Sequence, residues 1–154
     1  MPVKSLTRAL VIIIGMSGQY SLATDELLEG YTWQNRLLLV FAPDADDPRL
    51  QAQNEILTTV ESDLLERDLA ILRLLPDSPV TIDKLPLEGS EAAAIYRDFA
   101  IDRRAFAVLL IGKDGGVKLN SDTAVSANTI FDLIDSMPMR QWEMQNQASS
   151  NLQE

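Results

Sequence analysis

Two groups of charged residues in this sequence have the types and spacing that chemistry requires. The first is Asp44, Asp46 and Asp47, which directly follow a run of apolar residues. Carboxylate oxygens are the ligands that Ca²⁺ and Mg²⁺ prefer, so this acidic loop is a candidate site for a divalent cation. The alternative is that the aspartates only cap the next helix and stabilise its amino end. Capping is the favoured interpretation, because the loop lacks the spacing and the distal Glu of an EF-hand.

The second group is Arg103 and Arg104, adjacent cations in a chain that is otherwise short of positive charge. A guanidinium group matches the shape of a carboxylate or a phosphate and can donate two hydrogen bonds to it. Arg103 and Arg104 are therefore candidates to hold an anionic ligand or to pair with carboxylates of this chain.

Many other chemistries are excluded by composition, because the 154 residues include no Cys and no His. Without these residues there is no disulfide, no thiol nucleophile, no zinc ribbon and no Ser-His-Asp triad. Thirteen basic residues stand against 23 acidic ones, for a net charge of −10. Such an acidic surface repels nucleic acid and anionic membranes, so neither is an expected partner. The length fits one domain.

Three apolar runs predict strands that are buried on both faces, because no polar residues alternate with the apolar ones. A helix beginning at Asp47 and Pro48 and ending near Arg67 separates the first two runs, which predicts a parallel pair of strands with a right-handed crossover. Asp114 and Gly115 follow the third run and predict a tight hairpin to an antiparallel fourth strand. The three runs are residues 36–41, 69–75 and 106–111, and the fourth strand is 117–119.

Two more helices are predicted from capping residues and apolar spacing. Ser90 precedes apolar residues that recur at helical intervals, and Ser126 precedes another such set that stops before Pro138. Residues 76–89 are predicted to be a loop, and residues 145–154 a disordered polar tail. The two apolar helix faces are Ala92, Ile95, Tyr96, Phe99 and Ala127, Ile130, Phe131, Ile134.

The first 23 residues have the pattern of a secretory signal peptide. Lys4 and Arg8 precede the short apolar run 9–16, and small residues lead to a cleavage site after Ala23. The alternative is an N-terminal strand or helix of a protein that is not exported. We expect an exported protein, periplasmic or secreted, whose domain spans residues 24–144. The apolar run is shorter than the ~20 residues that cross a bilayer as a helix, so no transmembrane anchor is expected after cleavage.

The element order is similar to the thioredoxin-like fold, and two segments, 106–119 and 133–144, carry a closer resemblance. Their most specific pieces are Ile111-Gly112-Lys113-Asp114-Gly115-Gly116-Val117-Lys118 and Met137-Pro138-Met139-Arg140. They resemble the domain of unknown function 4174 family, whose members are exported bacterial proteins and vertebrate extracellular-matrix proteins and whose proposed relatives are thioredoxin-like and peroxiredoxin-like. The resemblance implies an α/β three-layer sandwich with a mixed four-stranded sheet flanked by helices, and no particular activity.

The resemblance also locates the missing redox chemistry. A peroxiredoxin carries Thr and Cys at spacings after a proline that, counted from Pro43, correspond to Asp47 and Leu50. Arg104 matches in order an arginine that commonly precedes the third peroxiredoxin strand, and Arg103-Arg104-Ala105 replaces the thioredoxin cis-proline. In such a fold Arg104 lies near the acidic loop, so we predict that Arg104 pairs with Asp44 or Asp46, because unpaired carboxylates would repel each other.

Two classes of function stay open. The first is a non-redox binding or structural module without cofactor, whose partner is an unidentified protein or small molecule. The second is an enzyme that depends on a cation or binds an anion, using the acidic loop with Arg104. Candidate surface residues for a partner are Lys113, Arg140 and Trp142, since Met and Trp near residues 137–144 suit an interface. The alternative for residues 137–144 is that they pack on the core of their own domain.

Overall fold

The computed structural model describes residues 28–76, 81–82, 85–86 and 89–151, so the predicted signal peptide and cleavage site lie outside the described residues. Six strands form one mixed sheet in the order β4-β3-β2-β1-β5-β6. The predicted parallel pair β1 and β2 and the predicted antiparallel pair β5 and β6 are confirmed. The strands are β1 (Arg36–Phe41), β2 (Leu69–Leu74), β3 (Thr81–Ile82), β4 (Leu85–Pro86), β5 (Ala107–Ile111) and β6 (Val117–Ser121).

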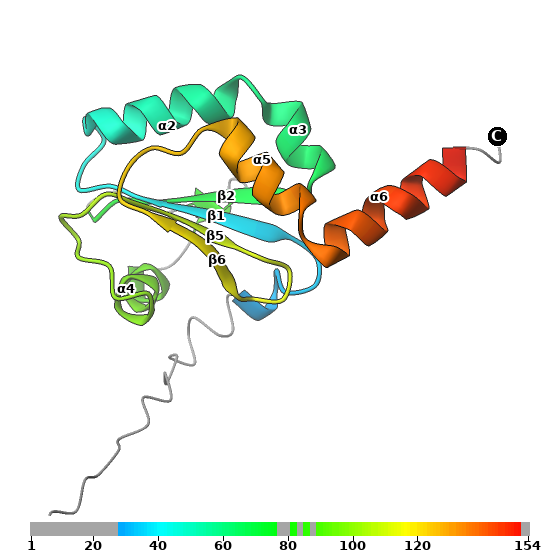
Figure 1. Cartoon of the computed structure of the whole chain (residues 1–154). Coiled ribbons are helices and arrows are strands. Elements are labelled where there is room, and N and C mark those ends of the chain that lie inside the picture. The colour runs from blue at the N-terminus through cyan, green and yellow to red at the C-terminus, as the bar shows by residue number, and fades with distance from the viewer. Residues whose placement is uncertain (1–27, 77–80, 83–84, 87–88, 152–154) are drawn as a thin grey trace, which may run out of the picture.

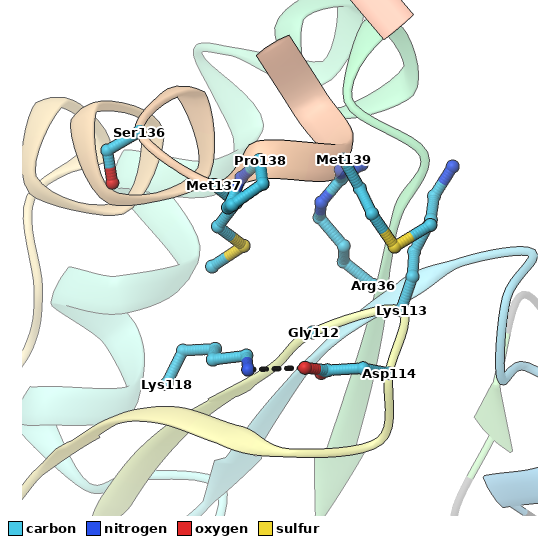
Figure 2. Close-up of a pocket in the computed structure, with 9 residues that line it drawn as sticks. All are labelled: Arg36, Gly112, Lys113, Asp114, Lys118, Ser136, Met137, Pro138 and Met139. Carbon is cyan, nitrogen blue, oxygen red and sulfur yellow. Dashed lines mark hydrogen bonds and ion pairs between the residues drawn. The ribbon is translucent and has the colours of Figure 1, made fainter. Parts of the chain in front are cut away.

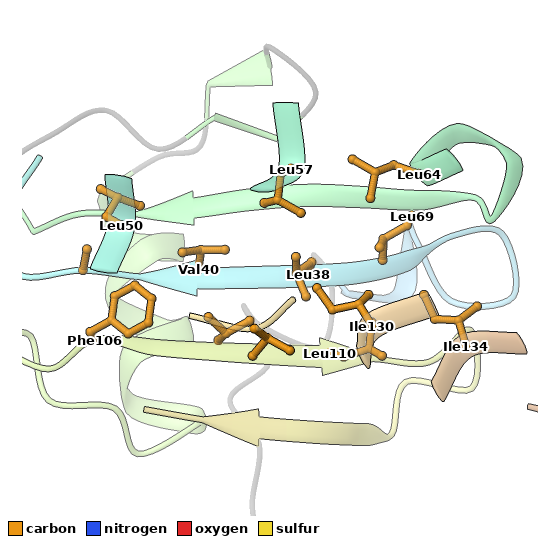
Figure 3. Packing of buried hydrophobic residues seen from close by; sticks show 13 residues of the cluster. Leu38, Val40, Leu50, Leu57, Leu64, Leu69, Phe106, Leu110, Ile130 and Ile134 are labelled. Atoms are coloured by element: carbon orange, nitrogen blue, oxygen red, sulfur yellow. The ribbon is translucent and has the colours of Figure 1, made fainter. Parts of the chain in front are cut away.

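Helices cover both faces of the sheet around β1, β2 and β5, so the predicted three-layer α/β sandwich is confirmed (Figure 1). Alternate residues of the buried strand β1 point to opposite faces, which explains why its apolar run is continuous. Leu38 and Val40 pack under α2 (Pro48–Thr58), α3 (Glu61–Glu66) and α5 (Ala127–Asp135), as Figure 3 shows. The other face, with Leu37, Leu39 and Phe41, packs against Ile95 and Tyr96 of α4 (Gly89–Asp98).

Two of the predicted helix caps are observed. The Asp47 side chain accepts a hydrogen bond from the backbone N–H of Arg49, and Pro48 is the first residue of α2. The Ser126 side chain caps α5 by accepting from the N–H of Thr129. The third cap differs, because α4 begins at Gly89 and Ser90 therefore lies inside the helix.

The single helix predicted from Pro48 to Arg67 is wrong, because the structure has two helices there. Val60 interrupts the helix with a φ of −131° and a ψ of 26°. Just before it, Thr59 donates its hydroxyl to the carbonyl of Ile56 at 2.8 Å. β-branched side chains and hydroxyls that bond to the local backbone both weaken a helix, which accounts for the break.

Two other segments are more regular than predicted. Residues 81–82 and 85–86, inside the predicted loop, form a short antiparallel hairpin on the edge of the sheet. The helix α5 ends before Pro138 as predicted, but Pro138 begins a further helix, α6 (Pro138–Asn151), which includes residues 145–151 of the predicted disordered tail. Hydroxyls of Ser149 and Ser150 donate to backbone carbonyls of the preceding turn. In Figure 1, α6 projects away from the rest of the domain.

Among the described residues, no helix is both long enough and apolar enough to cross a membrane.

Candidate functional site

The acidic loop after β1 is closed by its own interactions. Asp47 is buried and accepts hydrogen bonds from the Arg49 guanidinium at 2.6 and 3.0 Å. This contact lowers the pKa of Asp47, against the opposing effect of burial. Asp44 is exposed, and its carboxylate accepts from the backbone N–H of Asp46 at 2.9 Å. The described residues contain no group of three carboxylates, or of other ligand side chains, gathered for a metal ion.

The predicted ion pair of Arg104 with Asp44 or Asp46 is not formed. The side chain of Arg104 is exposed and has no salt bridge among those of the described residues, while its backbone N–H donates to the Asp102 carboxylate at 2.7 Å. Arg103 instead lies over the ring of Tyr96, with its guanidinium carbon 5.6 Å from the ring centroid, within the distance of a cation–π contact. The structure therefore does not join the two arginines to the acidic loop. Arg49, two residues along the chain, neutralises Asp47 in their place.

The position that the resemblance assigns to the peroxiredoxin cysteine holds a core residue. Leu50 is 3% exposed and packs against the apolar residues under α2 and α5. Next to it, Arg49 covers the ring of Phe106 at 5.1 Å from the ring centroid. Among the described residues, the end of the sheet where the resemblance places redox thiols is thus occupied by apolar packing and the Asp47–Arg49 ion pair.

An open pocket lies at the opposite end of β1, between the β5–β6 turn and the turn from α5 to α6. It has a volume of about 380 Å³, and we call it the hairpin pocket. One wall comes from the β5–β6 turn and the other from the start of α6, with Arg36 of β1 between them (Figure 2). The lining residues are Arg36, Gly112, Lys113, Asp114, Lys118, Ser136, Met137, Pro138 and Met139.

An ion pair lies along the β5–β6 wall of the hairpin pocket. Lys118 Nζ donates to the Asp114 carboxylate at 2.6 Å, and this contact lowers the pKa of Asp114 against the opposing effect of its partial burial. The pair lies against Gly112, where an added Cβ would come within 2.7 Å of both Asp114 Oδ1 and Lys118 Cε. Gly115 adopts a φ of +77°, which the turn requires and which few other residues tolerate. The glycines therefore shape this wall.

Behind the hairpin pocket, buried charges tie α6 to the sheet. Arg36 is 1% exposed, and both of its Nη atoms donate to the Glu143 carboxylate at 3.2 to 3.3 Å. Lys113 Nζ donates to Glu143 and to Asp68, each at 2.8 Å. Lys113 is 8% exposed, so its prediction as a surface residue is wrong. Lys113 can be buried because Glu143, which also accepts from the buried Arg36, compensates its charge.

A second set of buried charges adjoins the first. Arg140 is 1% exposed and donates to the Glu66 carboxylate, to the Glu66 carbonyl at 3.0 Å and to Asp135 at 3.2 Å. Arg67 donates to the same Asp135 at 2.7 Å. Burial raises the pKa of Asp135, but the hydrogen bonds from both arginines outweigh burial and lower it. Arg140 is therefore a buried anchor of α6, which corrects its prediction as a partner surface. We call these two sets together, Arg36, Glu66, Arg67, Asp68, Lys113, Asp135, Arg140 and Glu143, the ion network.

Trp142 differs from Lys113 and Arg140, because its side chain is 67% exposed as a surface residue should be. It is on the same helix as Met139, which is 36% exposed at the rim of the hairpin pocket.

Residues 27–143 match the family described as "domain of unknown function (DUF4174)". The chain belongs to the DUF4174 family. It is also 33% identical, over 141 residues and 81% of its length, to coiled-coil domain-containing protein 80 of Danio rerio. The chain spans only 16% of that relative's length.

The fold is thioredoxin-like. The crystal structure of reduced 2-Cys peroxiredoxin from Plasmodium vivax superposes with a TM-score of 0.57 at 18% identity, covering 74% of this chain and 83% of the peroxiredoxin. This DUF4174 chain has no cysteine with which to carry out peroxiredoxin chemistry.

The two short segments that carry the family resemblance in the sequence face each other in space. Gly112, Lys113, Asp114 and Lys118 come from one segment, and Met137, Pro138 and Met139 from the other, and both line the hairpin pocket. Sequence reasoning missed this pocket and the ion network around it. The available signal was the scarcity of cations: in a chain with 13 basic and 23 acidic residues, each cation beside an apolar run is a candidate for burial with several carboxylates.

Proposed function

We propose that this DUF4174 protein is a non-redox binding module that takes a small ligand in the hairpin pocket. One observation carries the proposal: among the described residues, Leu50 and the Asp47–Arg49 pair occupy the end of the sheet where the resemblance places redox thiols, whereas an open pocket lies at the opposite end. The two ends lie roughly 17 Å apart, because β1 has six residues and a strand rises about 3.3 Å per residue. A pocket of about 380 Å³ falls within the range of small-molecule sites.

Nuclear magnetic resonance of the ¹⁵N-labelled chain tests this function. Neutral, cationic and anionic organic molecules of five to eight heavy atoms are added one at a time. We expect that those that bind shift the amide signals of Gly112, Asp114 and Met139, which line the hairpin pocket. The proposal would be refuted if ligands shift only the amide signals of residues 43–49. It would also be refuted if no ligand shifts any signal of the domain. The probe size is chosen for a small pocket.

The enzyme that would use the acidic loop with Arg104 receives no support from the described residues, because Asp47 is engaged by Arg49 and Arg104 is paired with neither Asp44 nor Asp46. Calorimetric titration with Ca²⁺, Mg²⁺ and Mn²⁺ tests this alternative directly. Heat that disappears in a variant with Asn at positions 44, 46 and 47 would revive it.

We propose in addition that the protein is exported and that cleavage follows Ala23. The support is the order of Lys4 and Arg8, the apolar run 9–16 and the small residues before the cut. Mass spectrometry of the protein isolated from its source gives the mature N-terminus. A chain that begins upstream of Thr24 would contradict the proposed boundary.

A further inference from the structure

We infer that the ligand of the hairpin pocket is a small carboxylate that carries an aliphatic chain; this inference rests on the proposed function. The pocket joins hydrogen-bond donors on one side with apolar side chains on the other.

The first step is a buried donor with no partner. Arg36 has five N–H groups, and its Nη atoms donate to Glu143 and to the carbonyl of Arg67 at 2.8 Å. Its Nε–H lacks a partner among the described residues, although the side chain is 1% exposed. Leaving a buried donor unsatisfied costs about 1–3 kcal/mol. Because Arg36 lines the hairpin pocket, a ligand acceptor that displaces the atoms covering Nε recovers that cost.

The second step is the excess of donors over acceptors in the lining. An ammonium group has three N–H donors. Lys113 uses two of them on Asp68 and Glu143, and Lys118 uses one on Asp114. Asp114 is the one acidic side chain among the lining residues, and Lys118 already occupies it. Arg36, Lys113 and Lys118 are each paired with a carboxylate, but each keeps at least one unused N–H group. The ligand must therefore bring acceptors, and hydrogen bonds from charged donors are strongest to an anionic acceptor.

The third step is the start of α6, which forms part of the pocket wall through Pro138 and Met139. The amino end of a helix carries partial positive charge that favours an anion nearby. This effect adds to that of the lining cations and of the unpaired Nε–H of Arg36. On its own, the helix end would not identify the ligand as an anion.

The last step is the apolar wall. Figure 2 shows Met137 and Met139 extending towards the hairpin, across the pocket from the Asp114–Lys118 pair. Methionine side chains are flexible and adapt to aliphatic groups of varied shape. The Nη groups of Arg36 are already occupied by Glu143, which leaves one guanidinium donor for the ligand. A carboxylate with an aliphatic tail fits this limited polar site and its apolar neighbour better than a phosphate does.

The test is an NMR titration of the full chain at constant ionic strength with hexanoate, hexan-1-ol, hexylamine, acetate and inorganic phosphate. We expect hexanoate to bind at least about tenfold more tightly than each of the other probes, because each lacks the carboxylate or the chain. The amide signals of Gly112 and Asp114 should shift with hexanoate.

Three variants and a control complete the test. Lys118→Gln should weaken hexanoate binding by about tenfold, which is the effect of one lost hydrogen bond to a charged group. Gly112→Ala should also weaken it, because the new Cβ displaces the Asp114–Lys118 pair into the pocket. Met139→Ser should reduce the preference for hexanoate over acetate. Arg97→Gln removes an equal charge from a side chain that is 62% exposed on α4, and should leave binding unchanged.

Each contrary outcome is distinct. If hexanol and hexanoate bind equally well in the pocket, the ligand need not be a carboxylate, and the proposed binding function still stands. If acetate or phosphate binds as tightly as hexanoate, the inference that the ligand carries an aliphatic chain is wrong. If neither Lys118→Gln nor Gly112→Ala changes hexanoate binding, hexanoate binds elsewhere and the inferred site is wrong. If no probe shifts the pocket residues, both this inference and the proposed function fail.

Discussion

Arg36 and Glu143 lie 107 positions apart in the sequence and form an ion pair in which both guanidinium Nη atoms donate to one carboxylate. The pair joins the first residue of β1 to α6, a helix on which Arg140 is the one buried residue. Apolar packing therefore contributes little to the position of α6, and the ion network holds it. Because Met139 at the start of α6 lines the hairpin pocket, the network also sets the shape of the pocket.

Replacing Glu143 by Gln should destabilise the protein by about 3 kcal/mol. The substitution keeps the shape of the side chain but leaves the buried cations Arg36 and Lys113 without their shared carboxylate, and breaking a buried ion pair from one side is costly. Urea unfolding followed by circular dichroism measures the change. The control is Gln147→Ala on the exposed surface of the same helix, expected within about 0.5 kcal/mol of the parent. Equal unfolding free energies for the two variants would show that the ion network contributes no stability.

A second buried polar side chain, Gln53 of α2, holds the segment that leads into α5. Its amide donates to the carbonyl of Val125 at 3.1 Å and accepts from the N–H of Val125 at 2.7 Å. Gln53→Met keeps the volume but leaves two buried backbone groups unpaired, so we expect a loss of about 3 kcal/mol in the free energy of unfolding. Gln51→Met, on the exposed side of the same helix, is the matched control. A loss at position 53 no greater than at position 51 would contradict this role.

The parts of the fold that could be predicted from sequence depend on neighbouring residues. Asp47 before Pro48 marks a helix start, and Asp114-Gly115 marks a tight turn, because in each case residues a few positions apart determine the local backbone. The continuous run 36–41 indicates burial on both faces, which the structure confirms. The break at Val60 was missed, because apolar residues on both sides of it continue along one helix face.

The candidate site could not be predicted in the same way, because its residues come together only through the tertiary fold. Lys113 stands in a polar turn and Arg140 follows Pro138, so each has the local sequence of a surface residue. Their carboxylate partners at positions 68 and 66 are 45 and 74 residues away. The predicted approach of Arg104 to the acidic loop failed for the opposite reason, since a closer cation, Arg49, satisfies Asp47.

The contribution of Asp47 to the free energy of unfolding should depend on pH in the acidic range. Its hydrogen bonds with Arg49 lower its pKa below the ordinary 3.8, against the effect of burial. A lowered pKa gives stability that is present above pH 3.8 and is lost as the pH falls through the folded-state value. Asp47→Asn keeps the capping oxygen but not the charge, so the difference in unfolding free energy between parent and variant should shrink below about pH 4.

The cap and the charge of Asp47 are separated by a second variant. Asp47→Ala also removes the oxygen that accepts from the Arg49 backbone N–H, which should cost about 1 kcal/mol more than a variant that keeps the cap. Asp46→Asn in the same loop is the control, because the Asp46 side chain is exposed and caps nothing among the described bonds. A difference between parent and Asp47→Asn that stays constant from pH 7 to pH 2.5 would contradict the proposed charge effect.

At the other extreme of pH, Tyr96 should make stability fall as the solution becomes more alkaline. Burial raises the pKa of the Tyr96 hydroxyl to about 12 from the ordinary 10.0, although nearby Arg103 opposes the shift. The hydroxyl donates to the carbonyl of Leu74 at 2.8 Å in its protonated form. A raised pKa gives stability that is complete below pH 10 and is lost as the pH rises towards 12. Tyr96→Phe has no proton to lose, so its unfolding free energy should fall less steeply between pH 9 and pH 11.5 in urea titrations. Other titrating groups contribute equally to both proteins, and parallel curves would therefore show that Tyr96 ionises as easily in the folded chain as in the unfolded one.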